Sequence, residues 1–144
     1  MSMQTNIQYG YGIITTKIKI TDVEKIKAVL QRLPDYEQSI NEYFKDESIT
    51  QPTVEDFLTA IEELCSLAEI LETLIYNETG LLLYSCNDDN GYNYLLYPET
   101  YPWALNEIDL TLTESKLKSI FEKYVALLTD SPIQITYQRC ENFG

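Results

Sequence analysis

Hydrophobic positions recur along the chain with two different periods, and these periods predict its secondary structure. Alternation indicates four strands, over IQYGYGIITTKIKI (7–20), LLLYSC (81–86), YNYLLY (92–97) and IQITYQRC (133–140). Spacings of three and four residues indicate four helices: from the Thr21–Glu24 capping box to about Leu33, from Asp35 to about Lys45, from Val54 to Asn77, and from Thr113 to about Leu128. The predicted order is β-α-α-α-β-β-α-β.

This order predicts an α+β fold, in which a four-stranded, mainly antiparallel sheet carries the helices on one face. The turn NDDNG (87–91) joins two strands as a hairpin, because Asn-Gly tolerates positive φ. Gly10 and Gly12 share one face of the first strand, which is expected to lie close under a helix or a neighbouring ring. The third helix should be capped by Thr53, be buried on most sides in its later half and end at Gly80. Short connections and the lack of an internal repeat predict a single domain over residues 1–144.

The composition fits a globular protein and disfavours several partners. Of the 144 residues, 44% are hydrophobic and 23% charged, and the formal charge is -13. Such a chain repels phosphates, so neither direct nucleic-acid binding nor attachment to an anionic membrane is expected. No apolar run is long enough to span a bilayer, and MSMQTNIQYG does not read as a signal peptide. We therefore expect a cytoplasmic protein.

Cysteine and histidine usage narrows the possible chemistry. Three widely spaced cysteines, Cys65, Cys86 and Cys140, favour a reducing cytoplasm over a disulfide framework or a zinc site. The chain has no histidine, which removes the commonest general base and the commonest metal ligand. The sequence therefore favours a protein without enzymatic activity, and predicts no catalytic residue, metal or cofactor.

Charge is distributed unevenly along the chain. Between Asp46 and Glu114 there is no Lys or Arg, although fifteen of the 23 acidic residues lie there. If this segment forms one surface, it can steer a basic protein partner by its electric field. The alternative is an ordinary solvated surface. The candidates on the third helix are Glu62, Glu69 and Glu72, for which paired catalytic or metal-binding carboxylates are a further alternative.

Tyrosine is abundant, with twelve residues against four Phe and one Trp. Large rings lie on both faces of YNYLLY, so one set is expected to be exposed and to anchor an interface. The alternative is that helices cover one face while the hydroxyls on the other reach water. Asp88 and Asp89 in the hairpin turn are candidate binding carboxylates, with weak calcium contact as the alternative. The candidate aromatic residues are Tyr92, Tyr94, Tyr97, Tyr101 and Trp103.

The segments QYGYGI, YNYLLYPETYPW and YQRCENFG resemble a group of small uncharacterised bacterial and mobile-element proteins, and the resemblance implies no activity or site. The leading hypothesis is a non-enzymatic acidic protein-binding module, for example an inhibitor or immunity-type protein that docks on a basic partner. One alternative is a small-ligand or divalent-metal-dependent site, in a binder or an enzyme, that uses carboxylates and tyrosine hydroxyls. Another is a structural homodimer subunit that pairs through an uncovered sheet face or edge.

Overall fold

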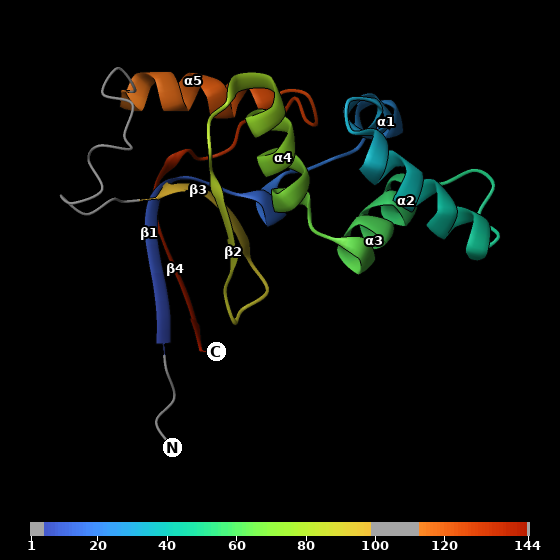
Figure 1. Ribbon diagram of the computed structural model, residues 1–144, viewed down its shortest axis with the longest axis horizontal. Helices are drawn as coiled ribbons and strands as arrows, with labels where there is room; N and C mark the ends of the chain where they lie inside the picture. The colour runs from blue at the N-terminus through green and yellow to red at the C-terminus, as the bar shows by residue number, and fades with distance from the viewer. Residues whose placement is uncertain (1–4, 99–112, 144) are drawn as a thin grey trace.

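The computed structural model describes residues 5–98 and 113–143 (Figure 1). Its described part has a four-stranded antiparallel sheet and five α-helices, in the order β-α-α-α-α-β-β-α-β. This confirms the predicted α+β fold, with five helices in place of four. Two predicted site residues, Tyr101 and Trp103, lie outside the described residues.

The sheet is built from β1 (Thr5–Ile14), β2 (Tyr84–Asn87), β3 (Asn93–Pro98) and β4 (Thr136–Phe143), in the order β2-β3-β1-β4. The predicted hairpin is β2–β3, and β1 pairs with both β3 and β4. The first strand is shorter than predicted, since Thr15–Lys17 form a 3-10 turn, η1. The buried Thr15 holds this turn against the hairpin, because its Oγ1 donates to the carbonyl oxygen of Asn93 at 3.2 Å.

The helices begin mostly where short polar side chains cap them. They are α1 (Val23–Gln31), α2 (Pro34–Asp46), α3 (Val54–Leu64), α4 (Leu67–Thr79) and α5 (Glu114–Val125). Thr53 and Thr113 cap α3 and α5 as predicted. The cap of α1 is Asp22 and not Thr21, since the Asp22 carboxylate accepts from the backbone N–H of Glu24.

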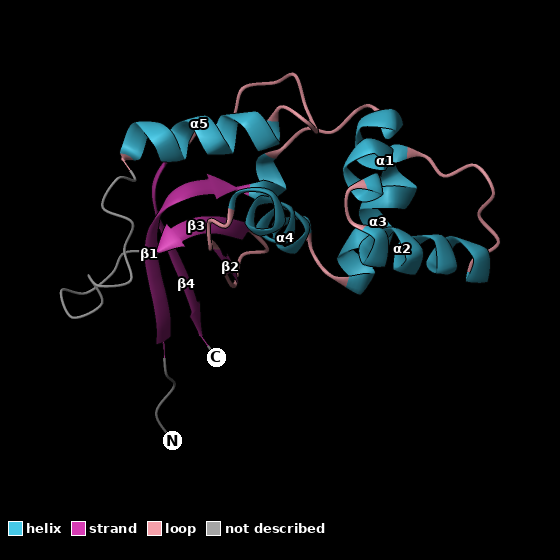
Figure 2. Cartoon of the chain, turned by 45° about the horizontal axis from the view of Figure 1, so that its top comes forward, coloured by secondary structure: helices cyan, strands magenta, loops and turns pink. Residues whose placement is uncertain are grey.

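The predicted third helix is interrupted, which is the main error in the prediction. Between α3 and α4, Cys65 leaves the helical conformation and Ser66 has an extended backbone, and Ser66 Oγ accepts from Glu69 N at 3.1 Å. Ser66 therefore starts a new helix, which ends at Gly80 in the left-handed conformation as predicted. The break lets α3 pack with α1 and α2 while α4 lies over the sheet (Figure 2).

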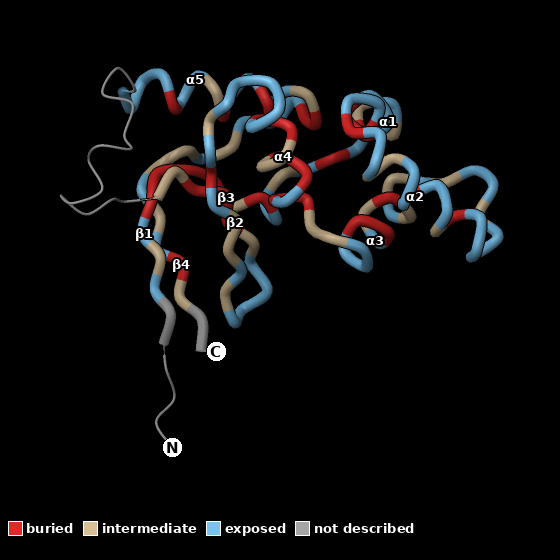
Figure 3. The backbone as a smooth tube through the Cα atoms, viewed as in Figure 1, coloured by how far each residue is buried: buried red, intermediate tan, exposed pale blue. Residues whose placement is uncertain are grey.

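The main hydrophobic core runs from the face of the sheet on which α4 and α5 pack into the group formed by α1, α2 and α3 (Figure 3). These first three helices were expected on the same sheet face, but they pack on one another beside the sheet. Tyr11 and Ile13 of β1 and Leu95 of β3 face this core, where the Tyr11 ring meets Phe121 of α5 edge to face. The later half of the long helix was predicted to be buried on most sides, but α4 is buried along one broad face and exposes residues such as Glu69 and Tyr76. Its buried residues are Leu67, Ala68, Ile70, Leu71, Leu74 and Ile75.

The sheet curls so strongly that its two edge strands approach each other. In a flat sheet, two edge strands separated by two others would lie about 14 Å apart. The Cα atoms of Cys86 on β2 and Cys140 on β4 are only 6.7 Å apart. Gly10 and Gly12 allow this curl, since a Cβ atom on Gly12 would overlap the carbonyl oxygen of Leu95. The close neighbour of these glycines is thus the backbone of β3, and not the predicted helix or ring.

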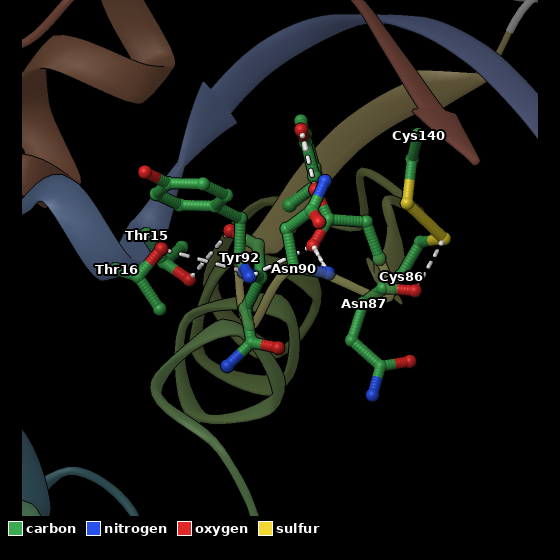
Figure 4. The surroundings of a disulfide bond; sticks show 10 residues. Thr15, Thr16, Cys86, Asn87, Asn90, Tyr92 and Cys140 are labelled. Carbon is green, nitrogen blue, oxygen red and sulfur yellow. Dashed lines mark hydrogen bonds between the residues drawn. A yellow bond between two sulfur atoms is a disulfide. The ribbon is translucent and has the colours of Figure 1, made fainter. Parts of the chain in front are cut away.

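The inner face of the curl holds a second, smaller cluster. It contains Tyr94, Leu96 and Cys140, with Ile14 and Cys86 packed against them. Cys86 and Cys140 form a disulfide bond (Figure 4), which contradicts the prediction of reduced cysteines. The prediction failed because an odd count also fits one pair plus one free thiol, Cys65, and because spacing does not show that the sheet edges meet.

Candidate functional site

A polar hollow of about 330 Å³ lies where the junction of α3 and α4 faces the β2–β3 hairpin. Both walls of the hollow are mainly polar. The helical wall consists of Glu62, Cys65, Ser66 and Glu69, and the hairpin wall consists of Ser85, Cys86, Asn87 and Asn93.

Two predicted site residues, Glu62 and Glu69, meet at this hollow by an unexpected route. They were expected two turns apart on one continuous helix. Instead, Glu62 lies near the end of α3 and Glu69 lies in the first turn of α4. The positive end of the α4 dipole favours an acid at that position. The break at residues 65 and 66 therefore brings the two carboxylates to one site.

The hollow carries negative potential. Burial raises the pKa of the half-buried Cys65 thiol, and the charges of Glu69 and Glu62 raise it further, although a hydrogen bond with the Ser66 backbone lowers it. Within residues 5–98 and 113–143, neither Glu62 nor Glu69 forms an ion pair with a lysine or arginine. A cation entering the hollow would therefore meet carboxylates that are not already neutralised.

Glu72, the third predicted carboxylate, lies beside the hollow and not in its wall. Its side chain joins α4 to β2, since Ser85 Oγ donates to Glu72 Oε2 at 3.4 Å. Burial raises the pKa of Glu72, the hydrogen bond from Ser85 lowers it, and the nearby Glu69 charge raises it. Glu72 therefore has a hydrogen-bond partner within the protein, and it holds Ser85, a residue of the hairpin wall, against α4.

The Asp88 carboxylate organises the hairpin turn. Its Oδ1 accepts from the backbone N–H groups of Asn90 and Tyr92, both at 2.9 Å, and its Oδ2 accepts from the Tyr94 hydroxyl at 3.1 Å. Both oxygens are therefore engaged inside the turn, whereas the neighbouring Asp89 is exposed.

The described candidate rings are divided between the interior and the surface. Tyr94 is buried in the inner cluster, and burial followed by its hydrogen bond to Asp88 raises its pKa. Tyr97 packs against the main core. Tyr92 is 43% exposed, with Lys17 Nζ 5.7 Å from its ring centre. Tyr84, which was not among the predicted site residues, is also 43% exposed.

A second acidic group, which the sequence analysis did not single out, surrounds Tyr43 of α2. Partial burial and then the charges of Glu47, Glu63 and Asp56 raise the pKa of Tyr43. Asp56 and Glu63 stand seven residues apart on α3, a spacing that places both on one helix face. The seven-residue spacing of Asp56 and Glu63 was the feature of the sequence from which this acidic group could have been predicted. The acidic segment therefore forms separate groups around α3.

The hollow is suited to binding a cation through oxygen acceptors. Among the described residues, no three His, Cys, Asp or Glu side chains come together as metal ligands would. The raised pKa of Cys65 leaves its thiol protonated at neutral pH, which makes it a poor nucleophile.

In the part of the chain that the structure covers, no helix has the length and apolarity needed to cross a membrane.

Comparisons of the chain with protein-family models, with curated proteins and with solved structures found no match.

Proposed function

We propose that the protein is a non-enzymatic binding module that docks on a basic protein partner, with a Lys or Arg side chain of the partner entering the hollow. One observation carries the proposal: Glu62 and Glu69, from two different helices, face one hollow without a basic residue paired to either among the described residues. Charge-assisted hydrogen bonds to carboxylates are stronger than neutral ones.

The remaining wall groups suit the same type of ligand. A guanidinium group has five N–H donors and no acceptor, so it needs several oxygen atoms around it. Besides the two carboxylates, the hollow offers the hydroxyls of Ser66 and Ser85 and the side-chain amide of Asn93. These groups favour a forked cation such as arginine over a simple point charge.

Charges outside the hollow would speed the encounter. The net charge of the chain is -13. Near the hollow, Asp56 and Glu63 lie on α3, the same helix as Glu62, and Glu47 lies at the end of α2 beside them. A field of one sign steers an oppositely charged partner and raises the association rate, more strongly at low salt. The proposed complex should therefore weaken as salt rises.

The test starts with capture of partners by the tagged protein from its native cells, at low and at moderate salt. Association of an identified basic partner is then measured with the Glu62→Gln/Glu69→Gln double variant. We expect its association rate at low salt to fall about tenfold, which lies at the lower end of electrostatic steering effects. The matched control is Glu24→Gln/Glu42→Gln, which removes two exposed charges from α1 and α2. Equal rates for the two double variants would refute a role for the hollow.

A homodimer is the second candidate, because part of the outer sheet face is exposed. Phe121 covers Tyr11 on this face, but Tyr137, which pairs with Tyr11 from β4, is 58% exposed. Toward the start of β1, Tyr9 is 44% exposed and Ile7 is 37% exposed. Light scattering during size-exclusion chromatography tests this candidate. A dimer that the Tyr9→Ser/Tyr137→Ser variant converts to a monomer would support it, and a wild-type monomer at high concentration would remove it.

A further inference from the structure

We propose that the Cys86–Cys140 disulfide is a redox-controlled clasp that holds the two edge strands of the curled sheet together. The two cysteines are 54 residues apart in the chain and lie on β2 and β4, the first and last strands of the sheet. The disulfide therefore joins strands that the sheet order separates.

The seam between these strands has little else to hold it. In the described sheet, backbone pairing joins β2 to β3, β3 to β1 and β1 to β4, whereas β2 and β4 have no ladder between them. Across the seam, the inner cluster adds only Tyr94, Leu96 and Ile14 to the two cysteines. The main core lies on the opposite face and belongs mostly to the helices. Breaking the disulfide should therefore loosen the seam and leave the helical core intact.

The two sulfur atoms differ in how well a reductant can reach them. Cys86 is half-buried, whereas Cys140 has no exposed surface. A thiolate of a dithiol reductant would attack Cys86 Sγ, forming a mixed disulfide while Cys140 leaves as a thiolate and takes up a proton. The second thiol of the reductant then displaces Cys86, which leaves as a thiolate and is protonated in turn. The reductant becomes a disulfide, and two electrons reach the protein.

The third cysteine provides an internal control. Ser85 bonds to Glu72 on α4, so alternation along β2 directs Ser85 toward the helices and Cys86 toward the inner face. Cys65 packs against the helix-side core and, although it lines the same hollow as Cys86, it belongs neither to the disulfide nor to the inner cluster. Cys65 is therefore outside the clasp, and its substitution should leave the seam unchanged.

Hydrogen exchange on oxidised and dithiothreitol-treated protein tests the clasp, with thiols counted by mass spectrometry. We expect one free thiol in the oxidised form and three in the reduced form. Amides of 84–87 and 136–140 should exchange at least about tenfold faster after reduction, while those of α1, α2 and α3 keep their rates. Cys86→Ser without reductant should reproduce the reduced pattern, and Cys65→Ser should match the wild type.

Three results would overturn the proposal. The first is three free thiols after treatment with a disulfide oxidant, which would mean that the bond does not form. The second is the same exchange rate at the seam in both redox forms. The third is faster exchange of every amide after reduction, which would make the bond a general structural support. If Cys86→Ser does not fold, the comparison of oxidised with reduced wild type still decides among these outcomes.

Discussion

The Tyr124 hydroxyl donates a hydrogen bond of 2.9 Å to Glu78 Oε1, and Arg32 Nη1 lies 3.3 Å from the same oxygen. Three helices thus meet at one carboxylate, since Tyr124 belongs to α5, Glu78 to α4, and Arg32 directly follows α1. The contact thus pairs Arg32 with an acid of the segment between Asp46 and Glu114, which contains no Lys or Arg of its own. Glu78 is therefore an acid of that segment used for internal packing.

Stability at high pH should depend on Tyr124. Burial, and then the hydrogen bond and charge of Glu78, raise the pKa of Tyr124 to about 12. An unfolded tyrosine ionises near pH 10, so this contribution to stability is complete below about pH 10 and is lost as pH rises toward about 12. We expect the free energy of unfolding, from urea titrations between about pH 9 and about pH 11.5, to fall less steeply in Tyr124→Phe than in the wild type. The exposed Tyr76→Phe should keep the wild-type slope. Equal slopes in all three proteins would contradict the assignment.

The curl of the sheet should depend on Gly12. In Gly12→Ala, the new Cβ would overlap the Leu95 carbonyl, and backbone atoms cannot move aside as a flexible side chain can. We expect a loss of about 3 kcal/mol in the free energy of unfolding, as for severe overpacking. Gly91→Ala is the control, because that site is open and only its φ of +88° opposes a side chain. Its cost should be about 1–2 kcal/mol. A smaller loss for Gly12→Ala than for Gly91→Ala would rule out close strand approach as the reason for the glycine.

The break between α3 and α4 should depend on Ser66. Ser66→Ala removes the acceptor for Glu69 N, and loss of such a cap costs about 1 kcal/mol. The same substitution at the exposed Ser39, within α2, should be neutral or slightly stabilising because Ala favours helices. Urea denaturation of both variants measures the difference. If Ser66→Ala is as stable as Ser39→Ala, the cap does not determine where α4 begins.

Local signals in the sequence predicted local structure well. Thr53, Thr113 and Gly80 act within one turn of their own positions, so their roles could be identified from neighbouring residues. The break at Ser66 had a local signal too, since Ser66 and Glu69 have the spacing of a capping box. It was missed because the apolar spacing continues through the break. A hydrophobic period alone therefore does not show that a helix is continuous.

Features that depend on distant residues were not predictable in the same way. Tyr92 and Tyr94 stand two residues apart, a spacing that places both on one face of a regular strand. However, Tyr94 is buried because the sheet curls around it, while Tyr92 at the hairpin end remains exposed. The disulfide likewise requires the approach of two edges that 54 residues separate. Part of the lining of the hollow was predicted, since Glu62 and Glu69 were candidate site residues. Ser85 and Asn93 were not, because they line the hollow only as a result of the packing of α4 on the hairpin.

The approach of β2 and β4 also bears on aggregation. An open sheet presents unpaired N–H and C=O groups at both edges, and strands from other molecules can add there to start a fibril. Here the edges face each other around Cys86 and Cys140, which leaves less room for an incoming strand at that point. The curl thus shields a tyrosine-rich sheet from intermolecular strand pairing where its edges would otherwise lie open.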